Sequence, residues 1–233
     1  MPRRRLILFD IDGTLISSGP VPRQCMAAAV GEHLMLKVEL SFHDVAGSTD
    51  PIIVRQALLK YGNDAPIDEG AISAILDRYL ELVETGLRPA DSVQVFPGAR
   101  ELIEACRAAG WATAIMTGNL ERGARIKLAD TGLWELFDFG IFGDDGHKRE
   151  DLPFVAAERA WDVLGEAYPA KTTILVGDTP ADARVARNAG MAGMVVCRRD
   201  DPEWRRAIED ERPTWLVDTL EETQQLIQWI KEF

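Results

Sequence analysis

Short apolar runs recur along the chain without alternating polar positions. They are Leu6–Phe9, Ala112–Met116, Thr173–Val176 and Gly193–Val196. Such runs are typical of strands in a parallel sheet that is covered on both faces. Two weaker runs, Phe139–Phe142 and Trp215–Val217, predict further strands of the same sheet.

Helical patterns separate these strands. They are Gly98–Ala109, Asp151–Leu164, Ala181–Ala189 and Leu220–Ile230. In the first pattern Leu102, Ile103 and Cys106 form one apolar stripe, and Gly110 follows as a helix-stop residue. The alternation of strands and helices predicts βαβ units and an α/β fold, with a Rossmann-like three-layer core around a parallel sheet.

Residues 17–92 interrupt this alternation. They contain helical patterns only, at Pro22–Leu36, Pro51–Tyr61 and Asp68–Leu87. A helical insert after the first strand explains the interruption with the fewest assumptions. We therefore predict an all-helical cap domain over residues 17–92, and a catalytic core formed by residues 1–16 and 93–233.

The composition indicates a folded protein with an acidic surface. The chain has 233 residues, of which 46% are hydrophobic, and a net charge of −12. Such a charge repels nucleic-acid backbones and anionic membranes, so we expect neither as a partner. An anionic substrate would need a local concentration of positive charge.

The expected location is the cytoplasm. The three cysteines form no CxxC pair, which argues against a disulfide framework or a zinc cluster. The basic start Met1–Arg5 resembles a signal sequence, but the apolar run behind it stops at Asp10 and is too short for one. The sequence leaves open whether the protein is a monomer or a homodimer.

The first predicted strand is followed by two acids one residue apart, Asp10 and Asp12. Ligands of open α/β sheets bind at the carboxyl ends of the strands, so this pair lies where chemistry occurs. In an extended backbone the two side chains would point to opposite faces, and Gly13 permits the turn that brings both into one pocket. A turn or a helix cap explains an isolated Asp-x-Asp pair about equally well.

Three later segments change this balance. Thr117-Gly118-Asn119 follows another strand and offers a hydroxyl and backbone amides to a phosphate oxygen. Asp178 and Asp182 follow a third strand and suggest ligands of a hard cation. Lys148 and Arg149 supply local positive charge. Taken singly, each segment also fits an ordinary turn, a helix cap or a solvated surface.

Together these motifs closely resemble those of the haloacid dehalogenase-like hydrolase superfamily. The resemblance rests on Asp10-x-Asp12-Gly-Thr, Thr117-Gly-Asn, the basic pair and Gly177-Asp178-x-x-x-Asp182, in this order after successive strands. It covers about Leu6 to Val217 and is loosely that of the phosphoglycolate phosphatase-like branch. It implies a Mg²⁺-dependent phosphatase that hydrolyses a small phosphorylated metabolite through an aspartyl-phosphate intermediate.

The resemblance also implies roles for single residues. Asp10 would be the nucleophile and Asp12 the acid/base. Mg²⁺ would be held by Asp10, Asp178 and the backbone carbonyl of Asp12, with Asp182 binding it directly or through water. The residues that hold the phosphate oxygens would be Thr117, Gly118, Asn119 and a basic residue.

The basic residue departs from the family pattern, in which a lysine is followed about two residues later by proline. Here both Lys148 and Arg149 precede Pro153. Alignment on the following helix favours Arg149, whereas the more common chemistry favours Lys148, to which we lean slightly.

We expect substrate specificity to reside in the loop before the second cap helix. Ser48 and Thr49 would supply hydroxyls to the substrate, and Arg55 would meet a substrate carboxylate. In the alternative interpretation Asp50 only caps the helix and Arg55 is solvated.

Two other functions fit the same motifs. A phosphomutase of this fold, similar to β-phosphoglucomutase, would retain the phosphoryl group and would also use Asp12. A noncatalytic phosphate-binding regulatory protein would need none of the acids as such, and their presence at all four positions argues against it.

Overall fold

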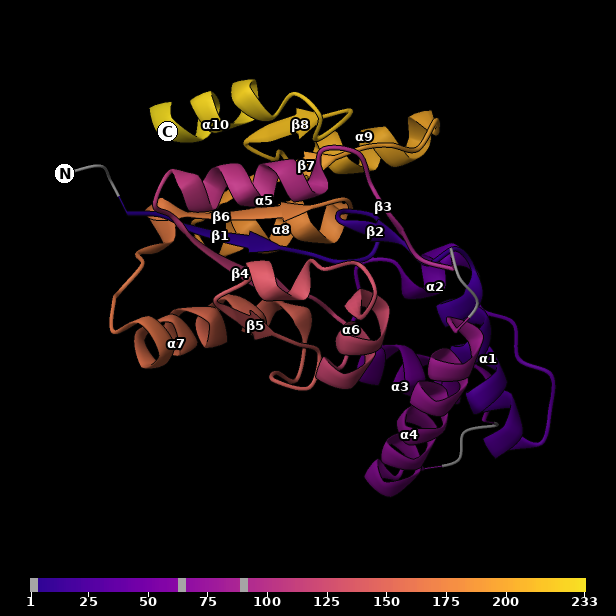
Figure 1. Cartoon of the computed structure of the whole chain (residues 1–233). Helices are drawn as coiled ribbons and strands as arrows, with labels where there is room; N and C mark the ends of the chain where they lie inside the picture. The colour runs from indigo at the N-terminus through magenta and orange to yellow at the C-terminus, as the bar shows by residue number, and fades with distance from the viewer. Residues whose placement is uncertain (1–3, 63–65, 89–91) are drawn as a thin grey trace.

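A six-stranded parallel sheet forms the centre of the molecule (Figure 1). The computed structural model describes residues 4–62, 66–88 and 92–233. In spatial order the strands are β5 (Phe139–Ile141), β4 (Ala112–Met116), β1 (Leu6–Phe9), β6 (Thr173–Gly177), β7 (Ala192–Val196) and β8 (Trp215–Val217). All six apolar runs are therefore strands, which confirms the predicted α/β fold.

Helices cover both faces of the sheet, which explains why β1 is apolar throughout. Ile7 and Phe9 belong to the apolar cluster formed with α5 (Ala99–Ala108) and α10 (Thr223–Glu232). Leu6 and Leu8 belong to the cluster on the opposite face, with α7 (Leu152–Leu164) and α8 (Pro180–Asn188). Successive side chains of a strand point to opposite faces, so a strand between two helical layers has no solvated side.

Two further helices of the core, α6 and α9, do not appear in the sequence analysis. They are α6 (Glu121–Leu128) and α9 (Pro202–Asp210). Both are short and rich in charged residues, so few apolar positions mark them in the sequence. The start of α9 is marked by Asp201, whose carboxylate accepts hydrogen bonds from the N–H groups of Glu203 and Trp204.

Four helices lie between two short antiparallel strands, as an insert beyond the carboxyl ends of the sheet strands (Figure 1). The flanking strands are β2 (Ile16–Ser17) and β3 (Gln94–Val95), and Ile16 pairs with Val95. The helices are α1 (Val21–Leu34), α2 (Phe42–Val45), α3 (Asp50–Tyr61) and α4 (Glu69–Gly86). The division at residues 17 and 92 remains a prediction.

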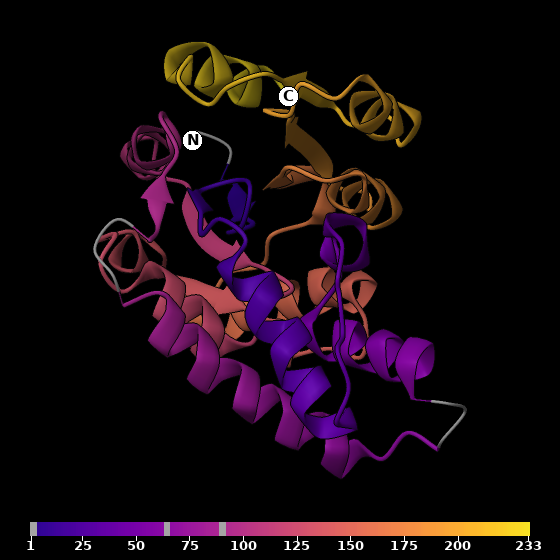
Figure 2. The same cartoon turned by 90° about the vertical axis from the view of Figure 1, so that its right-hand side faces the viewer.

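The helical insert has an apolar cluster of its own. Helices α1 and α4 lie side by side in both views (Figure 2). Between them and α3, Met26, Val54 and Tyr79 are almost fully buried. Within the described ranges, no helix is both long and apolar enough to cross a membrane.

The loop before α3 is pressed against the core. The Asp50 N–H donates to the Gly118 carbonyl at 2.8 Å, and the Asp50 carboxylate accepts the Leu120 N–H at 2.9 Å. A Cβ on Gly118 would lie 2.0 Å from the Ser48 carbonyl oxygen, so only glycine allows this approach. The alternative interpretation, in which Asp50 only caps the helix, is therefore wrong: α3 begins at Asp50 itself, and the Asp50 carboxylate accepts no hydrogen bond from α3 but bonds to the core.

Asp50 gives a prediction about stability. Burial raises the pKa of its carboxyl to about 6, although Lys127 and the Leu120 N–H lower it in part. A carboxyl with a raised folded-state pKa favours the folded protein at low pH, and this contribution is lost as pH rises from about 4 through about 6. The loss is on the order of 3 kcal/mol, at 1.36 kcal/mol per pKa unit.

We therefore expect Asp50→Asn, which keeps an acceptor for the Leu120 N–H, to gain stability relative to the original protein as pH rises. The gain should be about 2 kcal/mol between pH 4.5 and pH 7.5, measured by urea unfolding at each pH. Asp77→Asn, at an exposed position of α4, is the matched control and should show no such trend. A pH-independent difference for Asp50→Asn would contradict the prediction.

Candidate active site

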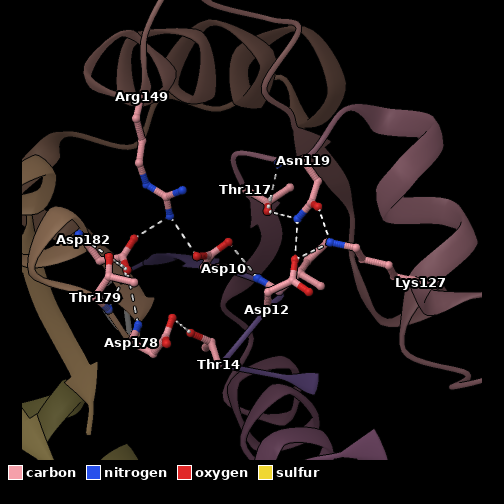
Figure 3. A network of polar contacts seen from close by, with 11 residues as sticks. Asp10, Asp12, Thr14, Thr117, Asn119, Lys127, Arg149, Asp178, Thr179 and Asp182 are labelled. Atoms are coloured by element: carbon pink, nitrogen blue, oxygen red, sulfur yellow. Dashed lines mark hydrogen bonds and ion pairs between the residues drawn. The ribbon is translucent and has the colours of Figure 1, made fainter. Parts of the chain in front are cut away.

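The carboxyl ends of three neighbouring strands meet at one cavity of about 510 Å³. Asp10 follows β1, Thr117 follows β4 and Asp178 follows β6. All three line the cavity, together with Asp12 from the first loop and Arg149 from the segment before α7. The structure thus brings together the predicted motifs, which lie far apart in the sequence (Figure 3).

Asp10 lies between two groups of polar side chains (Figure 3). It is only 6% exposed. Its Oδ2 accepts a hydrogen bond from Arg149 Nη2 at 2.8 Å, and its Oδ1 accepts the Ile11 N–H at 2.8 Å. Burial raises the pKa of Asp10, Arg149 opposes this, and the nearby Asp182 adds to it. Additional positive charge at this point would therefore stabilise the ionised form.

The two basic candidates lie in different environments. Arg149 is 6% exposed and donates to both Asp10 and Asp182 from Nη2. Lys148 is exposed and does not line the cavity. The slight preference for Lys148 is therefore corrected in favour of Arg149. Lys148 has an extended backbone at the start of a 3₁₀ turn, so the two consecutive side chains leave the chain in different directions.

Asp12 is held on the other side of the cavity by two donors (Figure 3). Its Oδ2 accepts hydrogen bonds from Lys127 Nζ at 2.7 Å and from Asn119 Nδ2 at 2.8 Å. Lys127 comes from α6, is 3% exposed and also donates to Asn119 Oδ1 at 2.5 Å. The sequence analysis missed Lys127, because nothing in a short charged helix indicates that its lysine is buried.

The remaining candidates have mixed placements. Thr117 is buried, and its Oγ1 accepts a hydrogen bond from Asn119 Nδ2 at 2.8 Å. Ser48 and Gly118 line the cavity. Thr49 is buried beside them, and its Oγ1 has no hydrogen-bond partner within the described part of the chain.

Arg55 does not reach the cavity, contrary to expectation. It forms an ion pair with Glu69 across the insert at 2.5 Å, and it is absent from the cavity wall. The position one turn into α3 faces another helix of the insert rather than the core.

Three carboxylates meet closely enough to hold a cation. Each of Asp10, Asp178 and Asp182 offers one oxygen, and these oxygens lie within 4.8 Å of one another. Burial and repulsion by Asp182 and Asp10 raise the pKa of Asp178 well above its usual range. Gly13 allows the approach, because a Cβ there would lie 2.0 Å from Asp178 Oδ2. The donor set fits Mg²⁺, which prefers carboxylate oxygens.

Asp182 also has other partners. Its Oδ2 accepts hydrogen bonds from the Thr179 N–H at 3.0 Å and the Thr179 hydroxyl at 2.7 Å, and its Oδ1 accepts from Arg149. Asp182 therefore orients Arg149 and completes the capping box at the start of α8.

A buried carboxylate with a basic partner and a second carboxylate lie beside an acidic cation site at the carboxyl edge of a parallel sheet. This arrangement is typical of an enzyme that works on phosphate esters. The comparison with known families agrees with this class. Residues 4–190 match the haloacid dehalogenase-like hydrolase family, and the chain belongs to it.

Individual relatives agree with the predicted enzyme class. The chain is 31% identical over 186 residues to a phosphoglycolate phosphatase of Cereibacter sphaeroides, which covers 79% of this chain and 81% of that protein. The structure of a predicted phosphoglycolate phosphatase from Haemophilus somnus 129PT superimposes with a TM-score of 0.71 at 20% identity, over 97% of this chain and 98% of that one. A putative β-phosphoglucomutase from Bacteroides vulgatus has a TM-score of 0.73 at 14% identity, over 99% of this chain and 90% of that one. The predicted phosphatase is thus confirmed, and the fold alone is shared with phosphomutases.

Proposed function

We propose that the protein is a Mg²⁺-dependent phosphatase that hydrolyses a small phosphorylated metabolite through an aspartyl-phosphate at Asp10. The observation that carries the proposal is the placement of two carboxylates with separate basic partners in one cavity. Asp10 pairs with Arg149 at 2.8 Å, and Asp12 pairs with Lys127 at 2.7 Å. One carboxylate is thereby poised for attack and the other for proton transfer.

The first step requires two anions to approach each other. Two unit charges 4 Å apart repel by about 4 kcal/mol at an effective dielectric constant of about 20. Arg149 is the cation nearest to Asp10, and it offers planar donors that suit phosphate oxygens. The Thr117 hydroxyl and the backbone amides that follow it would bind the other transferred oxygens. Asp10 Oδ would then attack phosphorus, and the ester bond would break.

Asp12 is the group that would move the proton. Its side chain is 40% exposed and lines the cavity, so it can reach a leaving-group oxygen. Lys127 and Asn119 hold one of its oxygens in a fixed position. Asp12 would protonate the leaving alcohol in the first step and then take a proton from the water that hydrolyses the aspartyl-phosphate.

Asp10, Asp178 and the backbone carbonyl of Asp12 would hold Mg²⁺, with Asp182 behind them. The ion would supply positive charge that offsets the repulsion between phosphate and carboxylate. The helical insert covers the cavity, so we infer that the substrate is small. The names of the relatives make phosphoglycolate the first candidate. We also propose that the enzyme acts in the cytoplasm, as a monomer or a homodimer.

A phosphate-release assay over a panel of phosphorylated metabolites tests this function. We expect release with Mg²⁺ that is lost on chelation with EDTA and restored by excess Mg²⁺. The loss should exceed a hundredfold, because the acids around Asp10 then lack their counter-charge. Activity that survives exhaustive chelation would contradict the metal requirement. No release from any substrate would contradict the phosphatase and favour a noncatalytic phosphate-binding protein, whereas transfer between two hydroxyls of one substrate would favour a phosphomutase.

A further inference from the structure

Three arginines line the same cavity without an acidic partner. They are Arg23 of α1 and the pair Arg198 and Arg199, which follow β7. Arg23 and Arg198 donate to the backbone carbonyls of Leu40 and Gly13, and Arg199 stacks on the Phe42 ring. Within the described ranges, none of the three pairs with a carboxylate. The two other basic residues of the cavity, Lys127 and Arg149, are both paired with acids.

Arg198 has an unused donor inside the protein. Its Nη1 donates to the Gly13 carbonyl at 2.7 Å, and its guanidinium carbon lies 4.2 Å from the centre of the Phe96 ring. Its Nη2 is buried and has no hydrogen-bond partner among the described residues. A buried donor without an acceptor is costly, and a ligand oxygen would remove that cost.

Two more buried groups, on residues of the cavity wall, lack partners among the described residues, and both can donate. They are Ser18 Oγ, beside β2, and Trp204 Nε1, in α9. Together with Arg198 Nη2 they form a set of unpaired donors on residues that line the cavity, while Asp10, Asp12 and Asp178 serve the phosphoryl and cation sites. Such a set matches a ligand rich in oxygen acceptors and negative charge.

We propose that this cavity recognises a second anionic group on the substrate, a carboxylate or a second phosphate, and that Arg198 is its principal contact. The inference rests on the proposed phosphatase function, and it names the substrate class: phosphomonoesters that carry another anion at the far end of a short carbon chain. Arg198 therefore determines specificity and does not take part in phosphoryl transfer.

A purely structural role would explain the Nη1 donor of Arg198 but not its positive charge or its unpaired Nη2. The bond to the Gly13 carbonyl needs one donor and no charge, and the amide of a glutamine is such a donor. The positive charge is partly buried, and among the described residues it forms no direct ion pair, although Asp178 and Glu221 act on it from a distance. A charge of this kind in a protein of net charge −12 is better explained by an anion that binds beside it.

Paired substrates test the proposal. The first pair is 2-phosphoglycolate and 2-hydroxyethyl phosphate, which differ only in the carboxylate. The second is propane-1,3-diol bisphosphate and 3-hydroxypropyl phosphate, which differ only in the second phosphate. For the original protein we expect kcat/KM to favour the anionic member of at least one pair by more than tenfold, and the pair that shows this identifies the anion.

The variant is Arg198→Gln, which keeps a donor for the Gly13 carbonyl and removes the charge. It should reduce the preference within that pair by about tenfold to a hundredfold. Arg206→Gln, at an exposed position of α9 outside the cavity, is the matched control and should keep the preference. Arg198→Lys is the second variant if Arg198→Gln does not fold, and it should keep part of the preference.

Each outcome bears on one proposal only. Equal kcat/KM for both members of both pairs would overturn the second-anion proposal while leaving the phosphatase intact. An equal fall for both members in Arg198→Gln would show that Arg198 only supports the Gly13 turn, and would also overturn it. Absence of turnover of every substrate by the original protein would instead contradict the phosphatase itself.

Discussion

Asp10→Asn is expected to lower kcat by about four powers of ten or more, because an amide oxygen cannot replace a carboxylate as the nucleophile. The variant should fold, since the asparagine oxygen can still accept the Ile11 N–H, and Arg149 keeps its ion pair with Asp182. Burial already disfavours the ionised form of Asp10, so removal of the charge should not lower stability. The measurement is single-turnover phosphate release with Mg²⁺, together with a thermal unfolding curve.

Asp162→Asn, at an exposed position of α7, is the matched control and should retain full activity. Acid quench of the original enzyme during turnover should trap phosphate on the protein, and the same quench of Asp10→Asn should trap none. If folded Asp10→Asn retained more than a few per cent of the original rate, Asp10 would not be the nucleophile.

Arg149→Ala should reduce kcat/KM by about 10³- to 10⁵-fold, the range found for arginines that stabilise a transferring phosphoryl group. Arg149 is also the shared partner of two buried carboxylates, Asp10 and Asp182. Loss of one partner from a buried ion pair costs about 3–5 kcal/mol, so a fall in unfolding free energy should accompany the loss of activity. The adjacent Lys148→Ala should change kcat/KM by less than about twofold, because Lys148 is exposed.

Arg149→Lys separates the two effects. It keeps a positive charge for the acids but loses the planar set of donors, so stability should recover more than activity does. The quantities to compare are kcat/KM and the midpoint of urea unfolding for all three variants. Similar small effects of Arg149→Ala and Lys148→Ala would mean that other residues balance the phosphate charge.

The sequence predicts the sheet and the acids for a clear physical reason. Buried parallel strands must be apolar on both faces. A polar residue directly after such a strand therefore breaks the apolar run, and it lies at the edge of the sheet where ligands bind. Asp10, Thr117 and Asp178 were found in this way, and the structure places all three around one cavity. The same pattern marks Arg198, because it follows the buried run Ala192–Val196 and Cys197 directly.

Features that depend on side-chain direction could not be read from the sequence. Lys127 reaches Asp12 because α6 turns one face toward the cavity, and the register of a short helix is not visible in its composition. The choice between Lys148 and Arg149 depends on one 3₁₀ turn. Asp50 sits in a pattern typical of a helix cap, but its carboxylate accepts a hydrogen bond from the N–H of Leu120, a residue 70 positions away.

The antiparallel pairing of β2 with β3 makes the helical insert exchangeable. The chain leaves the core at Ile16 and returns at Val95, and these two residues are direct partners. An insert of different length or sequence can therefore replace residues between these strands without changing the register of the central sheet. The insert-side walls of the cavity thus belong to one exchangeable segment, whereas Asp10, Thr117 and Asp178 belong to the sheet that stays in place.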